Sequence, residues 1–419
     1  METPLGGVGP WLSCRWREGH AGWRARREWL APFAVLLGVI VLTDLAGNPG
    51  RTLLPVYAEA ALRRPPYFTS MLVSIRLLMG GAAAFAGGPL CDALGQKRVV
   101  LLGLTGVPLV GGLLLLRSPL ALVLLSIYAG ISAGAYYFGV DSYMMAVVPL
   151  SFLGTATALV NGFQTLGGAL GSSLAGPVAD RYGFAAVGLG TMALGALVFV
   201  GCGLLLPARG RASGAVVPAR LSMGYGRVLR RPPVLLLALL RILPTAYYGT
   251  IVLLMPLLIY RVARVPSAAA YYATTAHLFS SGCQLVAGRI CDRYGRNVIV
   301  VGSMALMVFT ALATPFFTHS LIGLYVFGTL GAGMAWALTV AVPGLICDIS
   351  PLDERPRTLG LIHVAWYAGM IGGTQAAGWL VQTSAALPFL VAGLLNVAGL
   401  AVAIRLVQRY TGPRAAGEG

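Results

Sequence analysis

Long apolar runs alternate with short polar or charged turns along almost the whole chain. Most runs contain about 20 residues or more, the length that an α-helix needs to cross the hydrocarbon core of a bilayer. The pattern therefore predicts an all-α membrane protein with twelve transmembrane helices, at about residues 30–60, 67–90, 98–116, 119–147, 152–179, 184–206, 233–260, 266–289, 297–316, 320–347, 356–383 and 387–408.

Two of these runs contain a helix-interrupting segment at corresponding places. The first run, which is too long for one straight helix, contains Gly47-Asn48-Pro49-Gly50, and the seventh contains Pro244 followed by Gly249. Proline lacks the N–H that would continue the helical hydrogen-bond ladder. Paired interruptions in two halves favour a binding site near the midplane, although membrane helices also tolerate Gly and Pro without such a role.

Charged segments divide the chain into five parts. We expect a cytoplasmic N-terminal tail at 1–29, a six-helix bundle at 30–206, a basic linker at 207–232, a second six-helix bundle at 233–408 and a cytoplasmic C-terminal tail at 409–419. The linker has six arginines and no acidic residue, so it should lie on the anionic cytoplasmic leaflet. The N-terminal tail has no apolar core, which argues against a cleaved secretory signal.

The two predicted bundles repeat one sequence unit. A charged turn at 88–98 recurs at 288–296, with its two glycines and its aspartate each displaced by 200 positions. Pro66 corresponds to Pro266 at the same displacement. The repeat predicts two pseudo-symmetric halves of a membrane protein.

Composition and charge agree with this arrangement. The chain is 57% hydrophobic and 10% charged, with a mean hydropathy of +0.80, which places it in a bilayer. Its net charge of +17 is spread over alternate loops, with 20 Lys and Arg on one side of the predicted spans and six on the other. This asymmetry predicts both termini in the cytoplasm, in a cell (inner) membrane, and leaves no basic face for nucleic acid. The six cysteines form no C-x-x-C motif, so we interpret them as packing residues rather than metal ligands.

The spacing of glycine, aspartate and glycine in both turns, followed by basic residues, resembles two loops of the major facilitator superfamily, those between helices 2 and 3 and between helices 8 and 9. The resemblance covers about residues 30–408. It implies a twelve-helix transporter whose two halves rock about a central cavity to move a small-molecule solute across the lipid bilayer. No cofactor is implied, and we expect a monomer.

In that family the repeated turn is a cytoplasmic latch, in which the aspartate and first basic residue join an acidic residue at the end of the fourth helix. The second half has all three, Asp292, Arg296 and Asp348, whereas Gln96 and Ala146 stand at two of these places in the first half. We therefore expect the second latch to dominate. The residues implied in gating are Gly88, Asp92, Gly95, Lys97, Arg98, Gly288, Asp292, Arg293, Gly295, Arg296, Asp348 and Arg355.

Ionisable residues inside the spans are candidates for a substrate or proton pathway, because an unpaired charge in a membrane costs about 3 kcal/mol or more. They are Asp44, Arg51, Arg76, Asp141, Arg241 and His277. At about 1.5 Å per residue, Asp44 and Arg76 lie at matching depths, and so do Asp141 and Arg241. We therefore predict these two pairs; a purely structural ion pair is the alternative for each. Asp141 has no acidic counterpart in the tenth span, so we expect it to couple protons or bind substrate charge.

Other residues give weaker indications. Gly162, Gly171, Gly176 and Pro177 partly resemble the glycine-rich motif of the drug-exporting branch, although close helix packing explains the same glycines. Candidates for an aromatic cavity wall are Tyr136, Tyr137, Tyr247, Tyr248, Tyr271, Tyr272 and Trp336.

The sequence contains no phosphate-binding P-loop, so the expected energy source is an ion gradient, most simply of protons. We favour proton-coupled efflux of an amphipathic or drug-like compound. The alternative is proton-linked uptake of an anionic or zwitterionic nutrient. The four histidines are scattered along the sequence, so we do not expect an enzyme. A channel or a non-transporting receptor remains an alternative to a transporter.

Overall fold

The computed structural model describes residues 9–149, 152–208, 226, 228, 230–351 and 354–411, which are mostly helical and include no β-strand. Most of the predicted linker, residues 209–225, lies outside these ranges, as do residues 412–419 of the predicted C-terminal tail. The helices are α1 (Gly9–Ala60), α2 (Pro66–Phe85), α3 (Gly87–Leu94), α4 (Gln96–Leu104), α5 (Gly106–Gly112), α6 (Pro119–Val147), α7 (Leu153–Leu205), α9 (Pro232–Ala263), α10 (Pro266–Tyr294), α11 (Arg296–Ala313), the 3₁₀ turn η2 (Thr314–Phe317), α12 (Leu321–Ile349), α13 (Arg355–Leu380), α14 (Leu387–Leu406) and the π-helical turn η3 (Val407–Thr411).

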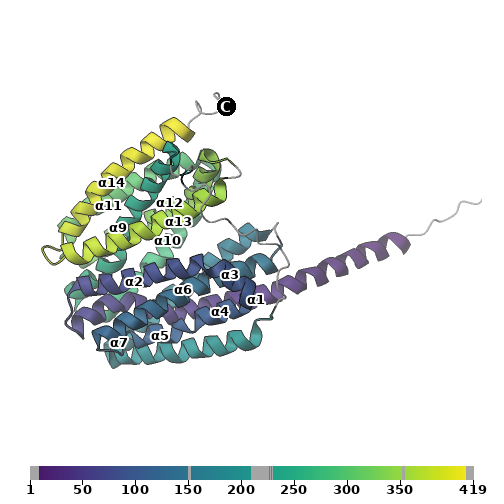
Figure 1. Cartoon of the computed structure of the whole chain (residues 1–419), viewed down its shortest axis with the longest axis horizontal. Coiled ribbons are helices and arrows are strands. Elements are labelled where there is room, and N and C mark those ends of the chain that lie inside the picture. Colours follow the sequence, from purple (N-terminus) through teal and green to yellow (C-terminus); the bar gives the residue numbers. More distant parts are fainter. Residues whose placement is uncertain are drawn as a thin grey trace, which may run out of the picture.

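Helices α1 to α7 form one bundle and α9 to α14 form a second bundle beside it (Figure 1). In the first bundle α1 packs against α7 and α2 against α6; in the second, α9 packs against α13 and α10 against α12. Each bundle has its own large apolar core. The cores are separate because each amphipathic or apolar helix buries its most apolar face against helices of its own half.

The two bundles repeat each other in local geometry as well as in sequence. Pro66 and Pro266 begin α2 and α10, and both sit in the first helical turn, where proline costs no hydrogen bond. Gly95 has φ 85° and ψ 151°, and Gly295 has φ 85° and ψ 153°. A side chain is strained at positive φ, so each charged turn uses glycine to redirect the chain into the next helix. The predicted pseudo-symmetry of the halves is confirmed.

The predicted interruptions of the first and seventh spans are not breaks in the helices. Helix α1 continues through Pro49, and α9 continues through Pro244. A proline removes one hydrogen bond and crowds the preceding turn, but neighbouring helices can hold the rest of the ladder in place. The fifth and sixth predicted spans correspond to the two parts of α7, which are two helices joined at a kink at Gly183, where φ is 81° and ψ is 172°.

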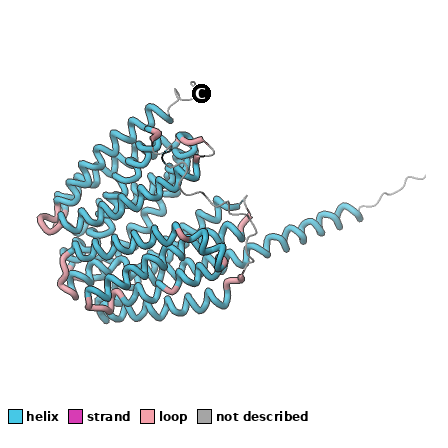
Figure 2. Tube along the Cα trace, viewed as in Figure 1, coloured by secondary structure: helices cyan, strands magenta, loops and turns pink. Residues whose placement is uncertain are grey.

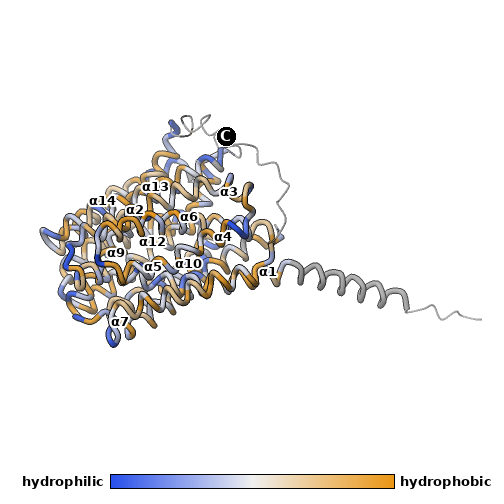
Figure 3. Tube along the Cα trace, turned by 60° about the horizontal axis from the view of Figure 1, so that its bottom comes forward, coloured by the Kyte–Doolittle hydropathy of each residue, from blue (hydrophilic) through white to orange (hydrophobic). Residues whose placement is uncertain are grey.

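Eight helices in the described part of the chain are long and apolar enough to cross a membrane. One of them, Thr155–Leu205, has 51 residues, far more than the roughly 20 that one crossing needs, and it includes the bend at Gly183. Helices α10 and α13 are long but less apolar, and both pack against the other bundle, α10 on α7 and α13 on α2. Hydrophilic residues gather at the helix ends, with apolar residues along the helices between them (Figure 3). The exact count of twelve spans stays a prediction.

The short turns between helices lie at the two ends of the bundles (Figure 2). We call the end that carries Asp92 and Asp292 the latch end, and the opposite end, which carries Glu59 and Arg261, the closed end. The helix axes of the two bundles diverge towards the latch end (Figure 1).

At the closed end the bundles are joined directly. Arg261 on α9 donates two hydrogen bonds to Glu59 on α1, at 2.8 and 2.6 Å. Asp180 of α7 accepts from the backbone N–H of Ser267 at 3.0 Å, which caps the first turn of α10. These contacts, together with the packing of α7 on α10 and of α2 on α13, hold this end together.

Candidate functional site

The first bundle contains a cluster of charged and phenolic side chains near the middle of its helices. Asp44 and Arg51 lie on one face of α1, two helical turns apart, and Arg51 Nη1 is 3.4 Å from Asp44 Oδ1. The same guanidinium donates to the hydroxyl of Tyr137 on α6, at 3.3 Å. Asp44 is buried, and this ion pair offsets part of the desolvation penalty of its charge.

The predicted pair of Asp44 and Arg76 is wrong, because Asp44 pairs with Arg51 on its own helix. Arg76 lies close enough to Arg51 for their positive charges to repel each other. Its Nη1 atom is buried and has no hydrogen-bond partner among the described residues. The Oδ2 atom of Asp44 is also buried and unpartnered. Buried polar atoms in proteins usually have a hydrogen-bond partner, so these two atoms stand out.

A second polar junction joins the bundles close to this cluster. The amide nitrogen of Asn48 lies 2.9 Å from the carbonyl oxygen of Gly168, 2.7 Å from Ser172 Oγ and 3.2 Å from Nε2 of His277. His277 comes from α10, in the second bundle, and Asn48 is buried. The polar residue beside Pro49 therefore connects α1, α7 and α10. His277, predicted as a pathway residue, lies in the contact between the bundles.

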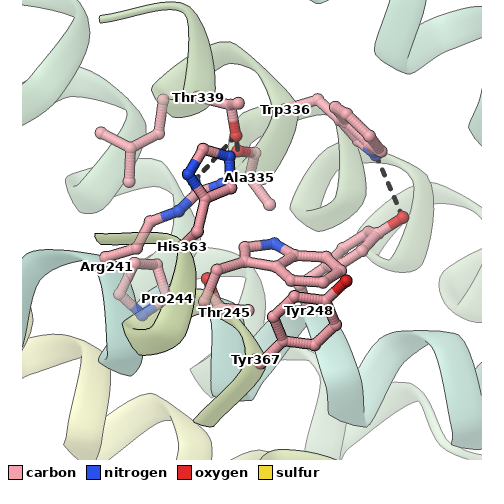
Figure 4. A pocket seen from close by; sticks show the side chains of 11 residues that line it. Arg241, Pro244, Thr245, Tyr248, Ala335, Trp336, Thr339, His363 and Tyr367 are labelled. Atoms are coloured by element: carbon pink, nitrogen blue, oxygen red, sulfur yellow. Dashed lines mark hydrogen bonds between the residues drawn. The ribbon is translucent and has the colours of Figure 1, made fainter. Parts of the chain in front are cut away.

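The second bundle contains a cavity of about 230 Å³ between α9, α12 and α13 (Figure 4). Arg241 lies at one side and donates from Nη1 to the hydroxyl of Thr339 at 3.0 Å. At the other side Trp336 donates from its indole N–H to the hydroxyl of Tyr248 at 3.0 Å, and their rings meet edge to face. His363, Trp366 and Tyr367 of α13 complete the polar and aromatic lining.

The predicted pair of Asp141 and Arg241 is also wrong. Arg241 binds Thr339 within its own bundle, and no ion pair joins Asp141 to a described residue. Asp141 is exposed on α6, and its charge interacts with His363 of the other bundle. Two groups at the same depth did not meet because depth fixes only one of the coordinates of a side chain.

Tyr367 connects the cavity of the second bundle with the charged cluster of the first. Its ring lies against Gly81 of α2, where an added Cβ atom would be 3.7 Å from the ring. Its hydroxyl group is near enough to Tyr137, which binds Arg51, for the two phenols to interact electrostatically. Tyr367 therefore lies between the cavity of the second bundle and the cluster of the first, and we call the cluster and the cavity together the central site.

At the latch end the predicted gating residues bind within their own bundle. Arg296 Nε lies 3.3 Å from Asp348 Oδ2, which confirms that the second half brings these two residues together. Arg355 donates to the carbonyl oxygens of Cys347 and Ser350, at the end of α12. The first residues of α11 and α13 therefore both bind the end of α12, within the second bundle.

The first-half gating residues behave in the same way. Lys97 donates to the carbonyl oxygen of Gly203 on α7, at 2.7 Å. Asp92 is exposed at the end of α3, and α3 packs against α2, α4 and α6 of its own bundle.

The remaining predicted gating residues lie at the surface or within helices. Asp292 and Arg98 are exposed, and the guanidinium of Arg293 lies over the ring of Tyr294. Gly88 and Gly288 lie within helices α3 and α10.

The glycines of the fifth predicted span serve close helix packing. A Cβ atom added to Gly171 would lie 2.3 Å from the carbonyl oxygen of Leu45 on α1. A Cβ atom added to Gly176 would lie 2.8 Å from Cα of Ser267 on α10. Gly162 has open space around it. Two of the three glycines thus let backbones approach, one within the bundle and one across the interface at the closed end.

A comparison with known protein families shows to which family the chain belongs. The model of the Major Facilitator Superfamily matches residues 36–343 and 265–418. The chain belongs to the Major Facilitator Superfamily. Members of this superfamily are membrane transporters and not enzymes.

Two curated relatives are drug-resistance proteins. The chain is 30% identical over 165 residues to the class C tetracycline resistance protein of Escherichia coli, a match that covers 38% of this chain and 41% of that protein. It is 26% identical over 122 residues to the quinolone resistance protein NorA of Staphylococcus aureus, covering 29% of this chain and 31% of NorA. The matches span less than half the length of these relatives.

Two solved transporters share the fold. A mutant of the nucleoside transporter NupG superposes with a TM-score of 0.74 at 13% identity, covering 89% of this chain and 99% of that chain. A bacterial homologue of the human lysosomal transporter Spinster, in an inward-facing and occupied conformation, gives a TM-score of 0.70 at 13% identity, covering 90% and 97%. At this identity the likeness concerns the superfamily fold alone.

Sequence reasoning missed part of the central site. Trp366 and Tyr367 belong to no recognisable sequence motif. His363 is one of four histidines scattered along the sequence, which gave no reason to place it in a site. A usable signal was the lower hydropathy of α13, which is long but is not among the eight helices of highest hydropathy. No group of three or more His, Cys, Asp or Glu side chains in the described ranges is arranged to hold a metal ion.

Proposed function

We propose that this chain is a secondary active transporter that exports amphipathic, drug-like compounds in exchange for protons. The observation that carries the proposal is the central site, in which Tyr367 links an aromatic cavity of one bundle to the charged cluster of the other. Such a mixed apolar and polar lining suits a compound with both characters. The tetracycline and quinolone resistance relatives favour export over uptake.

The proposal includes the domain arrangement and topology. Two halves, 30–206 and 233–408, would rock about the central site, joined by the basic linker 207–232 and flanked by cytoplasmic tails in the inner membrane. The latch end would then face the cytoplasm, in keeping with the excess of Lys and Arg in its loops. Contacts that join the bundles at the closed end and helices that diverge at the latch end support an inward-open state.

Direction and energy source can be tested in everted vesicles that contain the full chain. Tetracycline and norfloxacin serve as probes, and a pH gradient, acid inside, supplies the energy. We expect both probes to accumulate in the vesicles and to leave when a protonophore is added. Accumulation driven only by the opposite gradient would favour proton-linked uptake, and flux without counterflow would indicate a channel.

We propose Asp141 as the proton-coupling residue, and the partly buried ion pair of Asp44 and Arg51 as the contact that holds the cluster. Asp141 is exposed and faces a titratable residue of the other bundle, His363, so rocking changes its surroundings. Asp141→Asn should abolish gradient-driven transport and spare exchange at zero gradient. A folded variant that still transports against a gradient with unchanged pH dependence would overturn this assignment.

A further inference from the structure

The charge balance of the central site favours a negatively charged occupant. The embedded charges around the central site are three arginines (Arg51, Arg76 and Arg241) and two aspartates (Asp44 and Asp141), so one positive charge is in excess when histidine is neutral. The Asp44–Arg51 ion pair satisfies only one arginine. Arg76 keeps a buried, unpartnered nitrogen. A positive charge away from water is costly unless an anion approaches it.

Arg241 is the arginine best placed to meet that anion. It is half-buried in the cavity wall and binds one uncharged hydroxyl, that of Thr339. A guanidinium has five N–H donors in a planar fork, and the described residues provide no other partner for those of Arg241. The free donors fit a carboxylate or another planar oxyanion in a bidentate contact.

The rest of the cavity fits a flat aromatic body attached to that anionic group. Tyr248, Trp336, Trp366 and Tyr367 line it, and the indole and phenol groups of Trp336 and Tyr248 already bind each other (Figure 4). Aromatic rings pack well against rings of a ligand in offset-stacked or edge-to-face arrangements. A cationic ligand could also use these rings, but Arg241 in the same wall would repel it.

We propose that the central site binds an aromatic monoanion, with its anionic group on Arg241 and its ring against the aromatic wall. The proposal rests on the proposed function, since it names the class of compound that the transporter carries. It excludes aromatic cations as the preferred class. Arg76, on α2 of the first bundle, is a further source of positive potential.

Equilibrium dialysis of the purified full chain can test this with a matched set of probes at pH 7.5. The probes are 2-naphthoate, its neutral amide, 2-naphthylmethylammonium, and cyclohexanecarboxylate, an anion without an aromatic ring. We expect 2-naphthoate to bind at least about tenfold more tightly than each of the other three. Equal or tighter binding of the amide or of the ammonium compound would overturn the proposal.

Variants test the role of Arg241 itself. Arg241→Gln should weaken 2-naphthoate binding about 10- to 100-fold and leave the affinity for the amide unchanged, and Arg241→Lys should recover part of the loss. Without ligand, Arg241→Gln should melt at the same temperature as the parent or higher, because it removes an uncompensated charge. The matched control is Arg289→Gln, which changes an exposed arginine at the latch end. Unchanged 2-naphthoate binding in Arg241→Gln would overturn the assignment.

The vesicle assay separates failure of this inference from failure of the proposed function. If the full chain binds 2-naphthoate selectively but exports none of the probes, the binding site stands and the export function fails. If tetracycline is exported equally by the parent and by Arg241→Gln, and 2-naphthoate shows no preference, export stands and the monoanion site fails.

Discussion

The two ends of the bundles carry similar charged residues but use them differently. At the closed end Arg261 binds Glu59 across the interface, and at the latch end Arg296 binds Asp348 within its own bundle. A pair across the interface must break before the ends can separate, whereas a pair within one bundle does not oppose separation. The partner of each arginine, more than its presence, determines which end is held together.

The magnitude of these contacts shows that ion pairs alone do not close an end. Arg261 and Glu59 are both about a third exposed, and such pairs contribute about 1 kcal/mol or less. Stacking of Tyr67 on Trp379, with ring centroids 4.8 Å apart, and the close approach of α7 to α10 add apolar contact that does not depend on charge. The closed end is therefore stabilised mainly by helix packing.

The largest effect should come from preventing the closed end from opening. A Cβ atom added to Gly378 would lie 2.7 Å from Cβ of Ser70, so a shift of about 1 Å reaches the separation of a disulfide. In a variant without native cysteines, Ser70→Cys with Gly378→Cys should lose nearly all transport when oxidised and regain it on reduction. Each single variant is the control. Full transport by a protein shown to be cross-linked would contradict alternating access through this end.

A smaller effect should follow from reversing one charge of the closed end. Glu59→Arg places a like charge opposite Arg261, and we expect transport to fall about tenfold because the end no longer closes well. Adding Arg261→Glu restores an ion pair with the signs exchanged and should recover most of the activity. Independent, additive losses in the double variant would show that the pair does not act as a unit.

At the latch end we expect an asymmetry between the halves. Asp292→Asn should lower transport by about fivefold and Asp92→Asn by less than twofold at equal expression, because Arg296 and Asp348 are present only beside Asp292. Initial rates in vesicles measure both variants. Equal losses of transport rate would mean that the two latches contribute equally despite their different sequences.

The smallest effect should come from rebuilding the missing first latch. Gln96 begins α4 as Arg296 begins α11, and Ala146 lies in the last turn of α6 as Asp348 lies in the last turn of α12. Gln96→Arg with Ala146→Asp should therefore create an ion pair worth about 0.2–1 kcal/mol. Thermal unfolding of the two single variants and the double variant measures the coupling, which high salt should weaken. Strict additivity would show that the halves differ in geometry as well as in sequence.

Some features of the central site were visible in the sequence because they depend on position along one helix. The embedded charges stood out from the apolar spans, and Asp44 and Arg51, seven residues apart, necessarily share a face of α1. The second latch was also readable, since the repeat placed Arg296 and Asp348 at helix ends that adjoin in this fold. In the first case the helical period showed which face the two side chains share. In the second case the internal repeat showed which helix ends adjoin.

The partners across helices were not readable in this way. Depth matching paired Asp44 with Arg76 and Asp141 with Arg241, and the structure shows neither pair. Depth along a helix leaves its rotation and its neighbours undetermined, and a rotation of about 100°, the angle between successive residues, moves a side chain from the interface to the core. Tyr247 illustrates this, because it is fully buried in its bundle while the next residue, Tyr248, lines the cavity.

The sequence by itself determined that this is a helical membrane protein of two repeated halves, because hydropathy, helix-starting prolines and turn glycines act through local backbone physics. Only the tertiary structure decided which charges meet, which end of the bundles is joined and which aromatic residues of α13 reach the central site. Those outcomes depend on the rotation and tilt of helices set by packing over the whole bundle. The information is distributed among many small contacts, so no single stretch of sequence displays it.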